Sequence, residues 1–181
     1  MNGSTLQNIL SPISLEEIDR IVKINQEDLL KSYQTIHQII QEEIEIGISP
    51  WNIFLVGYSQ GGSIALAAEL TFPHALCGVI CLSGILPLYQ SACQLAENKK
   101  HKTSVLICHG EKDKLVPLWV SQASVEILMN NDYLVEFKIY PRTGHWLGKQ
   151  RIHDLRKYLR EKLYQSDSIK NEVALQDKFK S

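Results

Sequence analysis

The segment 57–62 reads GYSQGG and places a serine, Ser59, in a Gly-x-Ser-x-Gly pattern. An apolar run, 52–56, precedes the pattern, and a segment rich in Ala and Leu, 60–71, follows it. This context predicts a buried strand, a sharp turn and a helix, which together expose a nucleophilic serine above the edge of a sheet. A chance match is the alternative for the pattern taken alone.

Three residues next to Ser59 fit this chemistry. We expect Gly57 and Gly61 to leave room for the backbone segments that crowd such a turn. The helix after Ser59 directs its first N–H groups toward the reacting centre. The N–H of Gln60 is therefore predicted to donate to the oxyanion that develops when the serine attacks a carbonyl group.

A nucleophilic serine needs a base and a carboxylate that orients the base. Asp113 follows the predicted strand 104–108, and His145 follows the predicted strand 134–140. Catalytic groups gather at the carboxyl ends of strands in α/β sheets. The chain order serine, acid, histidine also accompanies this kind of serine turn. We therefore predict a catalytic triad of Ser59, Asp113 and His145.

Other residues compete for these roles. Glu111 is an alternative acid, and Asp113 could instead be a solvated loop residue between two lysines. His145 could be a residue without a catalytic task at the start of a helix. His109 could serve as the base, but it stands directly before Gly110 at the end of a strand, so we expect it to make a structural hydrogen bond.

The elements that must position these residues alternate between strand and helix. The segment 25–46 carries apolar residues at the helix period, with Asn25 as its cap and Gly47 at its end. Continuous apolar runs elsewhere predict strands buried on both faces, so the fold class is α/β with a mostly parallel sheet. The predicted strands are 52–56, 77–82, 104–108 and 134–140. The predicted helices are 25–46, 60–71, 117–130 and 145–163, the last with an apolar face of Leu147, Ile152, Leu155 and Leu159.

The length of 181 residues fits one domain. The segment 1–24 is poorly defined by its pattern, and the core is predicted over 25–164. The segment 165–181 is polar, and we expect it to be a tail that frays.

Composition excludes several classes of function. Lys and Arg number 19 and Asp and Glu number 20, so no basic excess favours nucleic-acid binding. No apolar run approaches the length that would span a membrane. The helix 25–46 carries too little positive charge to indicate binding at a membrane surface.

The four cysteines point to a reduced protein without a metal. They form no Cys-x-x-Cys pair, and no pair of histidines has the spacing of zinc ligands. The start of the chain lacks the pattern of a signal peptide. Reduced thiols and the absence of an export signal together predict a cytoplasmic location. The cysteines are Cys77, Cys81, Cys93 and Cys108.

Several of these motifs together resemble one enzyme family. GYSQGG at 57–62, LSGILPL at 82–88 and HGEKD at 109–113 are similar to segments of the phospholipase/carboxylesterase family, which includes the acyl-protein thioesterases. Val116-Pro117 and Gly144-His145 extend the resemblance, which covers about residues 25–163.

The resemblance implies an α/β-hydrolase fold and the hydrolysis of carboxylic esters or thioesters by Ser59, Asp113 and His145. The substrate would be a small molecule or an acylated protein, and no metal or organic cofactor is implied. By the same resemblance, the loop of Leu86, Pro87 and Leu88 would line the groove for the acyl chain. The alternative for at least part of this loop is that it packs on the body of the domain.

The sequence departs from the family before Asn52. The family's domain begins with several strands and a His-Gly-rich loop that supplies a second oxyanion N–H. Residues 1–24 are too few for two such strands and contain no His-Gly pair. We therefore expect an N-terminally truncated domain in which 52–56 forms an exposed sheet edge open to a partner. Weak or absent activity is expected, and an inactive remnant or interaction module is the alternative to an enzyme.

Overall fold

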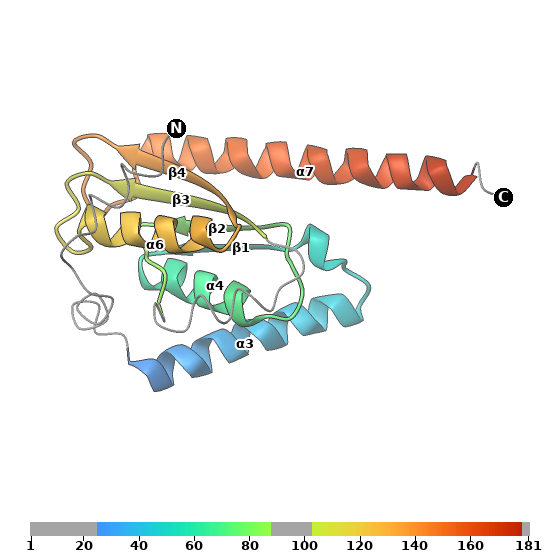
Figure 1. Ribbon diagram of the computed structural model, residues 1–181, viewed down its shortest axis with the longest axis horizontal. Coiled ribbons are helices and arrows are strands. Elements are labelled where there is room, and N and C mark those ends of the chain that lie inside the picture. Colours follow the sequence, from blue (N-terminus) through green and yellow to red (C-terminus); the bar gives the residue numbers. More distant parts are fainter. Residues whose placement is uncertain (1–24, 88–102, 179–181) are drawn as a thin grey trace.

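The computed structural model describes residues 25–87 and 103–178, with side chains up to Tyr164 (Figure 1). Its sheet has four parallel strands in the order β1-β2-β3-β4. The strands are β1 (Phe54–Tyr58), β2 (Gly78–Leu82), β3 (Ser104–Gly110) and β4 (Leu134–Tyr140). The parallel sheet predicted from the continuous apolar runs is thus confirmed.

Helices cover both faces of this sheet. The helices α4 and α6 pack on one face with α3 outside α4, and α7 lies across the other face (Figure 1). A short 3₁₀ helix, η1, leads into β1. The bounds are α3 (Gln26–Glu45), η1 (Pro50–Asn52), α4 (Gln60–Thr71), α6 (Leu118–Asn130) and α7 (Lys149–Lys178).

The central strands are buried on both sides because helices cover both faces. Every residue of β2 is buried. Val79 and Ile107 face the cluster shared with α4 and α6, while Ile80 and Leu106 face the cluster shared with α7. This arrangement explains why the strands read as apolar runs without alternation.

The helix α3 follows its sequence pattern. Leu29 and Ile40 are buried, and Ile40 packs against the end of α4 and the turn that follows it. The Oδ1 atom of Asn25 accepts hydrogen bonds from the first turn, 3.0 Å from the N–H nitrogen of Glu27. Gly47 ends the helix in the left-handed region, at φ 100°. The predicted cap and stop are both confirmed.

The helix α7 differs from its prediction in register and length. It begins at Lys149 rather than 145, and it continues to Lys178, through most of the segment that was expected to be a tail that frays. Leu147 and Ile152 are exposed, whereas Arg151 and Tyr158 are buried. Leu155 and Leu159 of the predicted apolar face do pack against the sheet, whereas Arg151 was missed because the apolar pattern does not count an arginine as buried. The segment 165–178 also contains no glycine or proline that would stop a helix.

The carboxyl ends of the strands lie at one edge of the sheet because all four strands run in the same direction. This edge receives the turn after β1 and the loops after β3 and β4, which carry Ser59, Asp113 and His145. Among the described strands, β1 borders only β2, so its outer side is an edge. The segment 1–24 lies outside the described residues.

Candidate active site

Ser59 occupies a strained turn between β1 and α4. Its backbone has φ 54° and ψ −122°, a combination that a residue with a side chain rarely adopts. Hydrogen bonds fix this turn on both sides. The Ser59 N–H donates to Leu82 O at 2.7 Å, and Ser59 O accepts from the N–H groups of Gly62 at 3.0 Å and Ser63 at 3.2 Å.

Glycines provide the space for this turn, although not both of the predicted ones. A Cβ at Gly57 would lie 2.1 Å from the carbonyl oxygen of Gly61. A Cβ at Gly61 would meet no described atom within 4 Å, so the expected crowding there is wrong. The second crowded position is Gly62, where a Cβ would lie 2.9 Å from Cys81 Sγ.

The imidazole of His145 lies between the serine and a carboxylate. Its Nε2 atom is 2.8 Å from Ser59 Oγ, and its Nδ1 atom is 2.7 Å from Asp113 Oδ2. The neutral tautomer that donates Nδ1–H to Asp113 has an Nε2 lone pair that accepts from the serine hydroxyl. Oγ, the imidazole and the carboxylate therefore form one chain of hydrogen bonds.

Asp113 is held so that one oxygen remains for the histidine. Its side chain is fully buried. Its Oδ1 atom accepts hydrogen bonds from the N–H groups of Leu115 and Val116, both at 2.9 Å. These bonds fix the carboxylate in its own loop and direct Oδ2 toward His145.

The competing acid and base are engaged elsewhere. Glu111 accepts a hydrogen bond from the N–H of Arg142 at 3.2 Å, on the surface. His109 is fully buried, and its Nε2–H donates to Val116 O at 2.9 Å. Burial also lowers the pKa of His109, which keeps its ring neutral. His109 thus makes the kind of structural hydrogen bond that its position suggested.

Cysteine is a poor alternative nucleophile in this region. Burial raises the pKa of the Cys81 thiol to about 12, and it also raises the pKa of Cys108. The thiolate is the reactive form of cysteine. At neutral pH these two side chains therefore behave as small apolar groups of the core.

Two residues that the sequence analysis did not select hold the peptide bonds around His145. The hydroxyl of Tyr58 donates to the carbonyl oxygen of His145, and the two rings lie 5.4 Å apart between centroids. The buried Arg151 donates from Nη2 to Gly144 O at 3.0 Å. The position of Tyr58, directly before the serine, was a signal for the first contact. Nothing in the local sequence pointed to the second.

The remaining predicted site residues lie in different environments. Gln60 is the first residue of α4, so its backbone N–H has no acceptor within the helix and lies beside Ser59. Leu86 is fully buried in the core cluster, and Pro87 is buried as well. Leu88 lies outside the described residues. The side chain of Leu86 therefore packs on the body, as the alternative interpretation of the loop foresaw.

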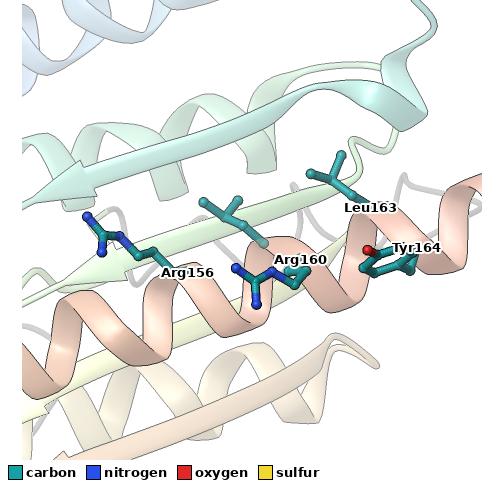
Figure 2. A pocket seen from close by; sticks show the side chains of 5 residues that line it. Arg156, Arg160, Leu163 and Tyr164 are labelled. Atoms are coloured by element: carbon teal, nitrogen blue, oxygen red, sulfur yellow. The ribbon is translucent and has the colours of Figure 1, made fainter.

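A separate groove of about 430 Å³ lies along α7. Figure 2 shows its lining, which contains no serine, cysteine, histidine or carboxylate and so offers no counterpart to the groups around Ser59. Within residues 25–87 and 103–178, no cluster of three or more His, Cys, Asp or Glu side chains could hold a metal ion. The groove is lined by Arg156, Leu159, Arg160, Leu163 and Tyr164.

None of the described helices combines the length and the apolar character that crossing a membrane requires.

Comparison with known proteins identifies related sequences. A family model described as phospholipase/carboxylesterase matches residues 13–163. A probable carboxylesterase of Oryza sativa subsp. japonica is 35% identical over 143 residues, which are 79% of this chain and 54% of the relative. Acyl-protein thioesterase 1 of Gibberella zeae is 33% identical over 150 residues, 81% of this chain and 64% of the relative. Another rice relative, 32% identical over 142 residues (78% of this chain and 58% of the relative), is described as a probable inactive carboxylesterase.

A solved structure extends the comparison to the fold. The crystal structure of SOBER1 from Arabidopsis thaliana matches with a TM-score of 0.72 and 32% identity, over 77% of this chain and 67% of that one. The chain spans between about half and two thirds of the length of the curated relatives named above. The sheet, its flanking helices and the sequence match together show that the chain has an α/β-hydrolase fold and belongs to the phospholipase/carboxylesterase family.

Proposed function

We propose that this protein is a serine hydrolase that cleaves carboxylic esters or thioesters through an acyl-enzyme. The observation that carries the proposal is the chain of hydrogen bonds from Ser59 through His145 to Asp113, at 2.8 and 2.7 Å. The strained turn at Ser59 supports it further, because it presents Oγ beside the first N–H groups of α4.

In the first half-reaction, His145 Nε2 accepts the hydroxyl proton of Ser59 while Oγ attacks the acyl carbon. Asp113 holds the ring in the required tautomer and stabilises its protonated form. The N–H of Gln60 donates to the oxyanion of the tetrahedral intermediate. The C–O or C–S bond then breaks, and the alcohol or thiol leaves with the proton from His145.

In the second half-reaction, water attacks the acyl group on Ser59. His145 accepts a proton from the water and returns it to Oγ as the acid leaves, so the enzyme is regenerated. The reaction as written needs no metal or organic cofactor.

The substrate class follows from the family. Relatives named carboxylesterase and acyl-protein thioesterase support esters and thioesters, carried by a small molecule or by an acylated protein. We propose that Pro87 and Leu88 border the acyl group with Leu86 packed beneath them. We propose a reducing compartment such as the cytoplasm, because the buried Cys81 and Cys108 are free thiols.

The proposal is tested by turnover of a short-chain p-nitrophenyl ester and of an acyl thioester whose thiol product is detected directly. We expect Ser59→Ala to lower kcat at least about 10³-fold. Thr35→Ala serves as the control, because that exposed hydroxyl donates to Lys31 O within α3. Turnover that survives in Ser59→Ala would refute the assignment of the nucleophile.

A second candidate is a non-catalytic interaction module. The apolar edge of β1 favours it, because Val56 is 48% exposed there and β1 borders only β2 among the described strands. The relative described as a probable inactive carboxylesterase also supports a member without turnover. A folded wild-type chain without turnover on either substrate would favour this candidate.

A further inference from the structure

Arg151 is a fully buried arginine in the first turns of α7. It is 1% exposed and is the largest of the fully buried side chains among the described residues. Arginine is almost never fully buried unless its charge is compensated, because removing a guanidinium from water is costly. The surroundings of this side chain therefore need a specific explanation.

The guanidinium joins two segments that meet at the candidate site. Nη1 donates to Ser83 Oγ at 2.5 Å, and Nη2 donates to Gly144 O at 3.0 Å. The guanidinium carbon also lies 5.2 Å from the centre of the Tyr140 ring, within the range of a cation–π contact. Both hydrogen bonds go to uncharged oxygen atoms, so the contact is a bridge rather than an ion pair.

Each end of this bridge is next to a member of the hydrogen-bond chain. Gly144 directly precedes His145. Ser83 follows Leu82, whose carbonyl oxygen accepts the N–H of Ser59, and Ser83 itself has a φ of 54°. The fork of the arginine thus links the turn beside the serine to the loop that carries the histidine.

The backbone around the guanidinium is shaped to admit it. Gly110 ends β3, and a Cβ there would lie 2.6 Å from Arg151 Nη2 and 2.4 Å from Gly144 O. Any side chain at position 110 would therefore displace the guanidinium or the loop. The absence of a side chain at this strand end is a second observation that ties Arg151 to the position of the His145 loop.

We propose that Arg151 is a positioning residue for His145: its two donors fix the peptide bond before the imidazole relative to the turn at Ser59. Tyr58 fixes the peptide bond after it. The consequence for catalysis rests on the proposed hydrolase function, whereas the consequence for the orientation of the imidazole does not.

The test compares Arg151→Met, which keeps an apolar stem but removes both donors, with Arg151→Lys, which keeps the charge without the fork. We expect Arg151→Met to lower kcat about 10²-fold, because a displacement of the imidazole by about 1 Å can have an effect of this size. KM should change less than about twofold, because the substitution leaves uniform substrate binding untouched. The kcat of Arg151→Lys should fall between those of Arg151→Met and the wild type.

Each rate is normalised to the folded fraction from circular dichroism. Arg156→Met is the matched control, an exposed arginine on the same helix that should behave as wild type.

A second measurement does not depend on turnover. The ¹⁵N resonances of the His145 ring, assigned with a His145→Gln variant, report the hydrogen bonds of Nδ1 and Nε2. They should shift in Arg151→Met and remain unchanged in Arg156→Met. If the wild type lacks activity, the proposed function fails, while a shift in these resonances still supports the positioning role.

Wild-type kcat together with unchanged His145 resonances in Arg151→Met would overturn the proposal. The proposal would also be overturned if a smaller folded fraction explains the whole loss of kcat, the loss is equal in Arg151→Met and Arg151→Lys, and the His145 resonances do not change. If Arg151→Met does not fold, Arg151→Lys is measured in its place. Wild-type kcat and unchanged His145 resonances in Arg151→Lys would then overturn the proposal.

Discussion

Two imidazoles lie near one carboxylate oxygen, and only one of them reaches the serine. Asp113 Oδ2 is 2.7 Å from His145 Nδ1 and 3.5 Å from His109 Nε2. His109 directs Nε2–H at Val116 O, and its Nδ1 atom has no partner in the part of the chain that the structure describes. His109 therefore supports the loop of Asp113, and His145 is the residue suited to act as the base.

The burial of His109 predicts a pH dependence of stability. Burial lowers its pKa in the folded chain below the ordinary 6.5, so the unfolded chain takes up a proton first as the pH falls. The contribution of neutral His109 to the free energy of unfolding is complete above about pH 6.5. It is lost as the pH falls from there through the pKa of the folded chain, by at most about 1.4 kcal/mol per pH unit. Denaturant unfolding of wild type and His109→Gln, whose amide can still donate to Val116 O, should differ in this slope.

The control is His153→Gln on the exposed side of α7, which should keep the wild-type slope. Identical slopes below pH 6.5 in wild type and His109→Gln would show that His109 is not the group responsible.

Substitution of the two acids distinguishes between them. Asp113→Asn should lower kcat on an activated ester by about 10⁴-fold, because an amide favours the wrong tautomer of the base. Glu111→Gln should remain within about threefold of wild type, since that carboxylate contacts only the N–H of Arg142 among its described partners. Steady-state rates at neutral pH decide, and a larger loss in Glu111→Gln than in Asp113→Asn would reverse the assignment.

At the scale of elements, the turn between β1 and α4 depends on a close approach of two backbone segments. Gly57→Ala would place a Cβ 2.1 Å from Gly61 O, so we expect the free energy of unfolding to fall by about 3 kcal/mol or more. Gly61→Ala would place a Cβ with no described atom within 4 Å and should change the free energy of unfolding by less than about 1 kcal/mol. Urea titrations provide both values, and equal effects of the two variants would contradict this account of the turn.

Most elements could be predicted from the sequence because their signals are local. The apolar runs gave the four strands within two residues at each end, and Asn25 and Gly47 gave the bounds of α3. The burial of Arg151 on α7 could not be predicted in this way, although Leu155 and Leu159 of the predicted face do pack on the sheet. An arginine becomes a buried residue only when distant segments, here Ser83 and Gly144, supply its acceptors.

The same distinction applies to the candidate site. The parallel topology places the loops after β1, β3 and β4 at one edge, so the approach of Ser59, Asp113 and His145 could be anticipated from the order of the elements. The contacts that hold these residues in place could not be anticipated. The contacts of Tyr58 and Arg151 with the backbone around His145 depend on side-chain directions that no local pattern encodes.

At the scale of the whole molecule, the edge of the sheet at β1 differs from the buried strands beside it. β1 reads Phe-Leu-Val-Gly-Tyr and contains no charged residue or proline that would discourage pairing with another chain. We expect the described domain to associate through this edge. Val56→Lys should therefore reduce association, as measured by light scattering against concentration, and shift Tm by no more than about 2 °C.

Ile152→Lys is the control for this prediction, because Ile152 is a similarly exposed apolar residue on α7. Equal suppression of scattering by both variants would indicate a general effect of charge and would remove β1 as the cause.

The proposed hydrolase requires that His145 and Asp113 activate Ser59 as a nucleophile. Intact-mass analysis after treatment with a fluorophosphonate tests it most directly, because this reagent reports an activated serine without any choice of substrate. We expect one adduct per wild-type chain, mapped to Ser59 and absent from Ser59→Ala, and labelling of His145→Gln should be slower by at least about 10³-fold. A folded wild-type chain that remains unlabelled, or that is labelled as fast after loss of His145, would contradict the claim.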